Sequence, residues 1–218
     1  MRRAARYPSR SDRPVAWPPV SGSPLRIATA RDVDALSQVL ARGFGDDPIW
    51  RWMAPTGTRW PDRLGPIFRH LLRPPIGFGA TWTTDDLEGT AVWSPPGRSG
   101  FPNGAAVRSA PTMLRGFGPA GIRRTLRLVA RMEKAHPPEP HWYLELLATD
   151  AHLRGRGVGS RLIGPGLDRA DAEGVGAYLE SSKWDKVPLY GRHGFEVVEE
   201  MVAVPGSPPM WRMWRDPR

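Results

Sequence analysis

Arg154-Gly155-Arg156-Gly157-Val158-Gly159-Ser160 is the stretch that decides how this chain folds. An apolar segment with the composition of a buried strand, Trp142–Thr149, comes shortly before it, and residues of helical spacing, Ser160–Ala172, follow it. Closely spaced glycines let backbone N–H groups approach an anion without obstruction by side chains. The positive end of the helix dipole and the side chains of Arg154 and Arg156 add to the attraction. The stretch therefore predicts a turn that binds a pyrophosphate.

The spacing of the glycines separates this turn from two other nucleotide-binding motifs. A Walker loop requires Gly-x4-Gly-Lys-Ser/Thr, and a dinucleotide fingerprint requires a glycine where Ser160 stands. The pattern Arg-x-x-Gly-x-Gly, which begins at Arg154, instead resembles the acyl-CoA signature of the GNAT acetyltransferase superfamily. Tyr190-Gly-Arg-His-Gly194-Phe195 is similar to the Tyr-x-x-x-Gly-Phe pattern of the same superfamily, and a predicted strand, Val175–Ser181, separates the two motifs.

A narrower resemblance, to the family of puromycin N-acetyltransferase and its relatives, rests on short segments from Leu25 to the C-terminus. The segments are Phe44–Pro48, Trp93–Pro96, Met132–Glu133, Pro138–Trp142, Gly164–Gly166 and Leu179–Ser182. The resemblance is densest over Pro137–Phe195. Two residues depart from the family pattern: Lys186 stands where an Asn commonly contacts CoA, and Pro165 interrupts the helix after the turn.

The resemblance implies one α/β domain over residues 25–218, with a central mixed sheet of six to seven strands and helices on both faces. In this superfamily the sheet splays between its fourth and fifth strands, and the pantetheine arm of the cofactor enters the gap. Elsewhere, prolines and glycines predict a loop over residues 95–104, and apolar spacing predicts a helix from about Ile122 to Lys134. Residues 1–24 hold five Pro, four Ser and five Arg against one acid, which predicts a disordered basic extension.

The resemblance places acetyl-CoA against the fourth strand and the glycine turn. Leu147, Ala148 and Thr149 would offer backbone groups to the pantetheine arm, and Lys186 would lie near the cofactor. The turn residues expected to hold the pyrophosphate are Arg154, Gly155, Arg156, Gly157, Val158, Gly159 and Ser160. A backbone N–H group close to the fourth strand would polarise the thioester carbonyl.

Acetyl transfer to an amine requires two groups that handle protons. Tyr190 resembles the general-acid tyrosine of the superfamily; the alternative is an aromatic core residue at the end of a helix. Glu145 is the candidate base, because a carboxylate in the middle of an apolar strand invites explanation. Regular alternation would place its side chain on the same face as that of Leu147. An exposed or ion-paired Glu145 stays open, and so does His141 as the base.

Asp46, Asp47, Trp50 and Trp52 lie where the family builds its acceptor pocket. Carboxylates and indoles suit a cationic aromatic amine. The alternative is that one of the aspartates caps a helix that begins at Pro48. The predicted reaction is direct transfer of an acetyl group from acetyl-CoA to the amine of a small molecule in a ternary complex, and aminonucleoside antibiotics are among the acceptors. A non-catalytic acyl-CoA-binding sensor or interaction module on the same fold is the competing hypothesis.

The composition excludes some chemistry and limits the partners. The chain has no cysteine, which excludes disulfides and an acetyl-cysteine intermediate. Its net charge is +9, and a basic domain suits a phosphate-rich cofactor; nucleic acid is not an expected partner. The histidines show no metal-ligand spacing, and no apolar run approaches the roughly 18 residues of a membrane span. We therefore expect a cytoplasmic protein that binds no metal and no membrane; a homodimer and a protein-lysine acceptor stay open.

Overall fold

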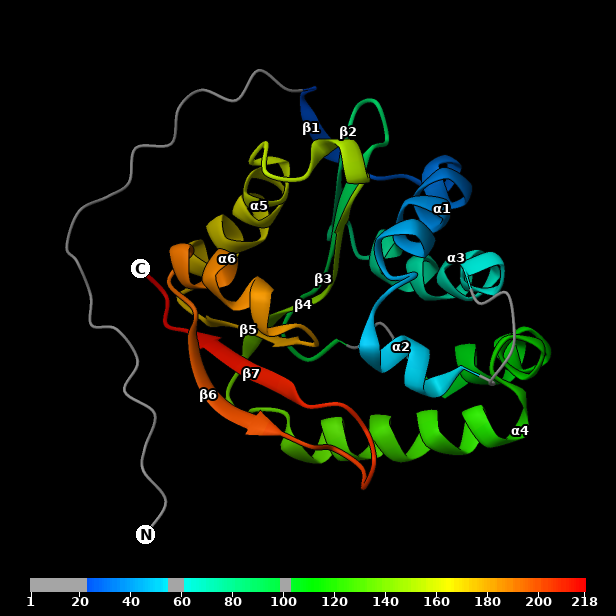
Figure 1. Ribbon diagram of the computed structural model, residues 1–218. Coiled ribbons are helices and arrows are strands. Elements are labelled where there is room, and N and C mark those ends of the chain that lie inside the picture. The colour runs from blue at the N-terminus through cyan, green and yellow to red at the C-terminus, as the bar shows by residue number, and fades with distance from the viewer. Residues whose placement is uncertain (1–22, 55–60, 99–102) are drawn as a thin grey trace, which may run out of the picture.

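The computed structural model describes residues 23–54, 61–98 and 103–218 of the chain. Seven strands form one mixed sheet in the spatial order β1-β2-β3-β4-β5-β7-β6 (Figure 1). The strands are β1 (Leu25–Ile27), β2 (Thr81–Thr84), β3 (Gly89–Ser94), β4 (His141–Thr149), β5 (Gly176–Ser181), β6 (Glu196–Met201) and β7 (Met210–Arg215). Only β4 and β5 run parallel; the other neighbours are antiparallel. The predicted fold class is confirmed.

Helices cover both faces of the sheet, and each face has its own apolar core. The helices are α1 (Val33–Gly43), α2 (Pro48–Met53), α3 (Pro61–Gly77), α4 (Asn103–Ala135), α5 (Val158–Ala172) and α6 (Val187–Arg192). Short 3-10 turns lie at Ala30–Asp32, Ala151–Leu153 and Trp184–Lys186. The first core joins residues of α1 to α4 with one face of β3 and β4, and the second joins residues of α5 with the other face (Figure 1).

Helix α4 is much longer than the sequence predicts. It begins at Asn103, inside the predicted loop, and it contains Pro111 and Pro119. Gly118 has non-helical dihedral angles of φ 64° and ψ 174°, so the chain kinks there and Pro119 begins a new helical run. Proline at the first turn of a helix lacks only an N–H that would have no helical partner, so Pro119 is tolerated at that position.

Strand β4 contains a bulge at Glu145. Leu144 and Leu146 pair with the consecutive residues Trp93 and Val92 of β3, which leaves Glu145 as an extra residue in β4. The alternation of faces therefore reverses: Leu144 lies in the core under α5, whereas Leu146 lies in the core under α1 and α3.

The fourth and fifth strands separate soon after they pair. Their register consists of His141 with Gly176, Trp142 with Ala177, and Tyr143 with Tyr178. Beyond Tyr143 and Tyr178, β4 continues to Thr149 and β5 to Ser181 without further pairing between them. The predicted splay is present, and its lips are the two strand segments past this last pair.

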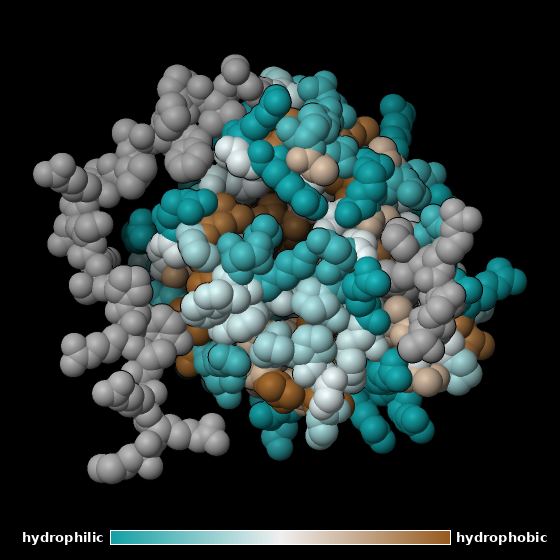
Figure 2. All heavy atoms as spheres, in the orientation of Figure 1, coloured by the Kyte–Doolittle hydropathy of each residue, from teal (hydrophilic) through white to brown (hydrophobic). Residues whose placement is uncertain are grey.

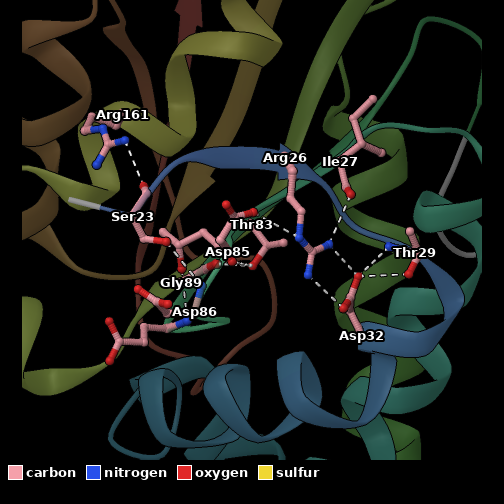
Figure 3. A network of polar contacts seen from close by, with 12 residues as sticks. Ser23, Arg26, Ile27, Thr29, Asp32, Thr83, Asp85, Asp86, Gly89 and Arg161 are labelled. Atoms are coloured by element: carbon pink, nitrogen blue, oxygen red, sulfur yellow. Dashed lines mark hydrogen bonds and ion pairs between the residues drawn. The ribbon is translucent and has the colours of Figure 1, made fainter.

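The segment before β1 is joined to the β2–β3 hairpin and to α5 (Figure 3). The Asp85 N–H donates to the carbonyl of Pro24 at 2.9 Å, and Arg161 Nη2 donates to the carbonyl of Ser23 at 3.0 Å. Beside them, Arg26 pairs with Asp32 at 2.8 Å. Residues 1–22 lie outside the described residues, so the predicted extension over residues 1–24 stays a prediction.

Candidate functional site

The turn between β4 and α5 presents an exposed backbone. Gly155 and Gly157 adopt left-handed conformations with φ of 76° and 77°, which disfavour any side chain. A Cβ atom at Gly155 would meet nothing within 4 Å. Gly157 caps α5, and Arg161 makes a helical hydrogen bond back to its carbonyl at 3.1 Å. Because the first N–H groups of a helix have no intrahelical partner, the turn fits a pyrophosphate.

The side chains of the turn separate into an exposed and an inner group. Arg154 and Arg156 are exposed, whereas Val158 is buried and Ser160 is half-buried. A Cβ at Gly159 would lie 4.0 Å from both Leu147 on β4 and Leu189 on α6, which shows how closely α5 approaches these elements. Figure 2 shows a recess of hydrophobic residues on this side of the molecule, surrounded by hydrophilic side chains.

The part of β4 that is predicted to bind pantetheine pairs with a neighbouring strand along one edge only. Leu147, Ala148 and Thr149 pair with Ala91, Thr90 and Gly89 of β3. On the opposite edge, the pairing with β5 stops before this segment, at Tyr143. The backbone of this part of β4 is therefore available to a ligand in the gap. Lys186 is exposed and forms an ion pair with Asp185 at 2.9 Å, so the structure does not join it to this strand.

Glu145 stands on one lip of the splay. Its Oε1 atom accepts a hydrogen bond from Ser94 Oγ at 2.5 Å. Ser94 follows Trp93, which lies in the core under α5, and so Ser94 faces α1 to α4 by alternation. Glu145 therefore faces α1 to α4, whereas Leu147 packs toward α5. The expected shared face of Glu145 and Leu147 is wrong, because the bulge reverses the alternation between them.

The alternative base, His141, is engaged at the start of β4. Its Nδ1 atom lies 2.6 Å from the carbonyl of Glu139, and its Nε2 atom lies 2.8 Å from Nε2 of His136. Burial lowers the pKa of His141 below its usual value, although the interaction with Glu139 opposes this change. These contacts hold its ring nitrogens away from the gap between the strands.

Tyr190 lies on α6 and is half-buried. Its ring packs edge-on against Phe195, with the ring centroids 6.3 Å apart. Burial raises the pKa of the Tyr190 phenol, and the negative charge of Asp47 raises it further. The phenol is therefore protonated at neutral pH, and Asp47, which is distant in sequence, lies close enough to influence it.

Asp47 caps α2 and joins the α1–α2 loop to the end of β5. Its side chain is 2% exposed, and Oδ1 accepts hydrogen bonds from the N–H groups of Ile49 at 2.9 Å and Trp50 at 3.1 Å. Its other oxygen, Oδ2, accepts a hydrogen bond from Ser182 Oγ. Burial raises the pKa of Asp47, whereas the hydrogen bond from Ser182 lowers it.

Asp46 makes a second contact between the same two segments. Lys183 Nζ lies 2.7 Å from Asp46 Oδ1, and this hydrogen-bonded pair lowers the pKa of Asp46. Arg154, on the glycine turn, contributes to the same lowering. The α1–α2 loop therefore lies between the end of β5 and the turn, beside the splay.

The predicted acceptor-pocket indoles pack against neighbouring helices. The Trp50 ring lies 4.7 Å from Phe68 and 6.2 Å from Phe117 between centroids. The Arg124 guanidinium lies over the Trp52 ring at 5.8 Å. The Trp50 ring therefore packs in the core, and the Trp52 ring packs against Arg124 of α4. Acceptor binding by Trp50 and Trp52 stays a prediction.

Glu180 on β5 was missed, although it carries the signal that identified Glu145. It is the one charged residue of β5, and the structure places it on the other lip of the splay. Tyr143 lies between the two glutamates. Burial raises the pKa of Tyr143, and the charges of Glu180 and Glu145 raise it further.

Two absences concern only the part of the chain that the structure describes. Within residues 23–54, 61–98 and 103–218, no three His, Asp or Glu side chains gather as they would around a metal ion. In the same residues, no helix is both long and apolar enough to cross a membrane.

The known proteins with similar sequences and structures are acetyltransferases. A family model described as the acetyltransferase (GNAT) family matches residues 116–195. An uncharacterized N-acetyltransferase of Schizosaccharomyces pombe is 24% identical over 176 residues, which cover 76% of this chain and 71% of the relative. A crystal structure of histone acetyltransferase HPA2 and related acetyltransferase from Corynebacterium glutamicum is 26% identical, with a TM-score of 0.68, over 90% of this chain and 97% of that one.

A polyamine N-acetyltransferase of Drosophila melanogaster shares the fold. Its TM-score is 0.62 at 16% identity, over 88% of this chain and 98% of that one. The family model, the yeast relative and the solved structures agree in pointing to the GNAT acetyltransferase superfamily. The narrower resemblance to puromycin N-acetyltransferase is not tested by these comparisons and stays a prediction.

Proposed function

We propose that this chain transfers the acetyl group of acetyl-CoA to the amine of a small molecule by direct attack in a ternary complex. The observation that carries the proposal is the splay between β4 and β5. One end of the gap adjoins the glycine turn, Glu145 stands on one lip, and Tyr190 follows the other strand. A non-catalytic sensor would need the turn and the gap, but it would need neither the carboxylate nor the phenol.

Backbone groups would bind the cofactor more than side chains would. The N–H groups of Gly157, Val158 and Gly159 at the start of α5 would hold the pyrophosphate, with Arg154 and Arg156 as exposed counter-charges. The open edge of β4 at Leu147–Thr149 would hold the pantetheine arm as an added strand. Bound acetyl-CoA supplies the thioester carbon that the amine attacks.

Glu145 is proposed to remove a proton from the acceptor. An alkyl ammonium group has a pKa of about 10, so most of it is protonated at neutral pH and cannot attack. The hydrogen bond from Ser94 fixes one oxygen of the carboxylate on the lip of the gap. The carboxylate can then accept a proton from the ammonium group.

Tyr190 is proposed to protonate the departing thiolate. A thiol has a pKa of about 8.5, so the thiolate benefits from a donor as it leaves. Burial and the nearby Asp47 charge keep the phenol protonated until that moment. The superfamily resemblance of the Tyr190–Phe195 segment supports the same role. Several structural neighbours are enzymes that acetylate amines, such as the Drosophila polyamine N-acetyltransferase, and they support an amine acceptor here.

The test is release of CoA thiol from acetyl-CoA across a panel of amines. The panel contains puromycin, aliphatic diamines, arylalkylamines and a lysine peptide. We expect acetyl-CoA to raise the melting temperature, NAD and ATP to leave it unchanged, and at least one small amine to release thiol. Binding of acetyl-CoA with no release by any amine would contradict the enzyme and support the sensor. Stabilisation by NAD alone would contradict both.

A further inference from the structure

Glu180 is a carboxylate that the proposed steps do not use. The last paired residues of β4 and β5 are Tyr143 and Tyr178. Glu145 lies two residues past Tyr143, and Glu180 lies two residues past Tyr178. The two glutamates therefore occupy corresponding positions on the two strands where these separate.

Both glutamates face the same side of the sheet. Leu179 lies in the core under α5, so Glu180 faces α1 to α4 by alternation. Glu145 is held on that side by its hydrogen bond from Ser94. Both charges act on the Tyr143 phenol, whose pKa is raised by burial and then by Glu180 and Glu145. The gap is therefore bordered by two carboxylates with a protonated phenol between them.

The carboxylate of Glu180 is only half satisfied. Oε1 accepts a hydrogen bond from the Tyr178 hydroxyl at 2.8 Å, and that hydroxyl accepts one from Arg212 Nε at 3.0 Å. Oε2 is buried and accepts no hydrogen bond of good geometry in the part of the chain that the structure describes, although the Tyr143 hydroxyl interacts with the same carboxylate. A buried carboxylate oxygen without a donor is costly and rare in folded proteins. This oxygen is therefore suited to a donor that the chain does not provide.

The surrounding charges favour a cationic donor. His136 and His141 lie on the same side, and burial lowers the pKa of both, to about 4 for His136, so both are neutral at neutral pH. Arg212 is the cation that contacts Tyr178, and Glu199 pairs with it at 2.5 Å. Burial raises the pKa of Glu180, so its ionised form is favoured by a second ammonium group on the acceptor and disfavoured by a carboxylate there.

We infer that Glu180 is the second carboxylate of the acceptor site, where its Oε2 receives a hydrogen bond from a positively charged nitrogen of the acceptor. Glu145 then faces the amine that is acetylated, and Glu180 holds the far end. The inference rests on the proposed function and narrows the acceptor to amines that carry a second cationic nitrogen.

Three acceptors of equal chain length test this inference: putrescine, aminobutanol and γ-aminobutyrate. They differ only in the far group, which is an ammonium, a hydroxyl or a carboxylate. For the wild type we expect kcat/KM to be highest for putrescine and lowest for γ-aminobutyrate. Glu180→Gln should reduce the preference for putrescine over aminobutanol by about tenfold, through KM, because one charge-assisted hydrogen bond is lost. Acetyl-CoA affinity should stay unchanged.

Glu196→Gln is the matched control. It removes an exposed carboxylate from β6, outside the network that contains Arg212 and Tyr178, and it should leave the preference unchanged. Equal effects of Glu180→Gln on all three acceptors, or none, would overturn the inference. If the Gln variant does not fold, Glu180→Asp tests the same difference between putrescine and aminobutanol, because its shorter side chain moves the carboxylate back by one methylene group.

A failure of the proposed function is distinguishable from a failure of this inference. If the wild type acetylates no amine, the proposed function fails. Calorimetric titration of putrescine and aminobutanol into the CoA-loaded protein then tests Glu180 alone. Tighter binding of putrescine that is lost in Glu180→Gln supports the second carboxylate, and equal binding of the two amines overturns it.

Discussion

The two sides of the splay are built differently. The cofactor side is local in sequence: β4, the glycine turn and α5 follow one another within residues 141–172. The acceptor side is assembled across the chain. Ser182 reaches Asp47 over 135 positions, Lys183 reaches Asp46 over 137, and Ser94 reaches Glu145 over 51. The cofactor is bound by backbone that glycines expose, whereas the acceptor site depends on side chains brought together by the fold.

This difference teaches which substitutions separate the two functions. A change in the turn should remove cofactor binding and leave the acceptor side folded, because its contacts do not pass through the turn. A change on the acceptor side should alter turnover or selectivity while acetyl-CoA still binds. Three predictions follow this division, and a fourth concerns the stability effect of His136; they run from the largest expected effect to the smallest.

Gly157→Asp should weaken acetyl-CoA binding by about a hundredfold or more. The left-handed φ strains any side chain, and the carboxylate would stand against the pyrophosphate. Gly164→Asp places the same group further along α5, where a Cβ meets nothing within 4 Å, and it should bind normally. Calorimetry and thermal shift measure both variants. Equal loss in the two would mean that helix damage, and not the turn, explains the effect.

Tyr190→Phe should lower single-turnover acetyl transfer by about a hundredfold, the range of a general acid. Acetyl-CoA affinity should barely change, because the lost interaction strengthens only as the thiolate forms. Ring packing on Phe195 is kept, so thermal unfolding serves as the folding control. A wild-type single-turnover rate would remove Tyr190 from the chemistry and support the sensor.

Glu145→Gln should lower turnover by about tenfold to a hundredfold, with the largest loss at low pH. The fraction of free amine falls as the pH falls, so a base that deprotonates the ammonium group matters most there. The measurement is the pH profile of kcat/KM beside that of Glu196→Gln, an exposed carboxylate on β6. Parallel profiles for Glu145→Gln and the wild type would make Glu145 structural.

His136→Phe should flatten the fall in stability between pH 6.5 and 4. Burial, and then the charges of His141 and Arg212, lower the pKa of His136 to about 4, so the folded state binds fewer protons than the unfolded state below pH 6.5. Stability is therefore lost as the pH falls through this window. Denaturant unfolding at several pH values should show a wild-type loss about 1 to 3 kcal/mol larger than that of the variant, the upper figure being the full linkage of the shift and the lower one allowing for the partial exposure of the ring. Parallel losses of stability in the wild type and the variant would contradict the prediction. His141 is retained in both proteins, so its own titration does not distinguish them.

The sequence predicts the local parts of this molecule well and the assembled parts poorly. Residues 154–160 predict the turn, because the spaced glycines and the helix that follows them are neighbours in the chain. The cap of α2 by Asp47 was an open alternative, and the structure shows it. The bond from Ser182 to Asp47 could not be predicted, because periodicity carries no information on contacts between distant segments. The bulge at Glu145 was hidden for a related reason: the extra residue is defined by its partners on β3, not by its own sequence.

That bulge has a consequence for how β4 tolerates change in length. Removing the extra residue would restore regular alternation and keep the rest of the strand on its present faces, because Leu144 and Leu146 would become neighbours opposite Trp93 and Val92. Leu146 and Ala148 would stay in the core under α1 and α3, and Leu147 would stay on the α5 side. A one-residue deletion at Glu145 therefore removes the carboxylate and leaves the packing of both layers in place. The bulge is the point where β4 can lose a residue without turning the rest of the strand over.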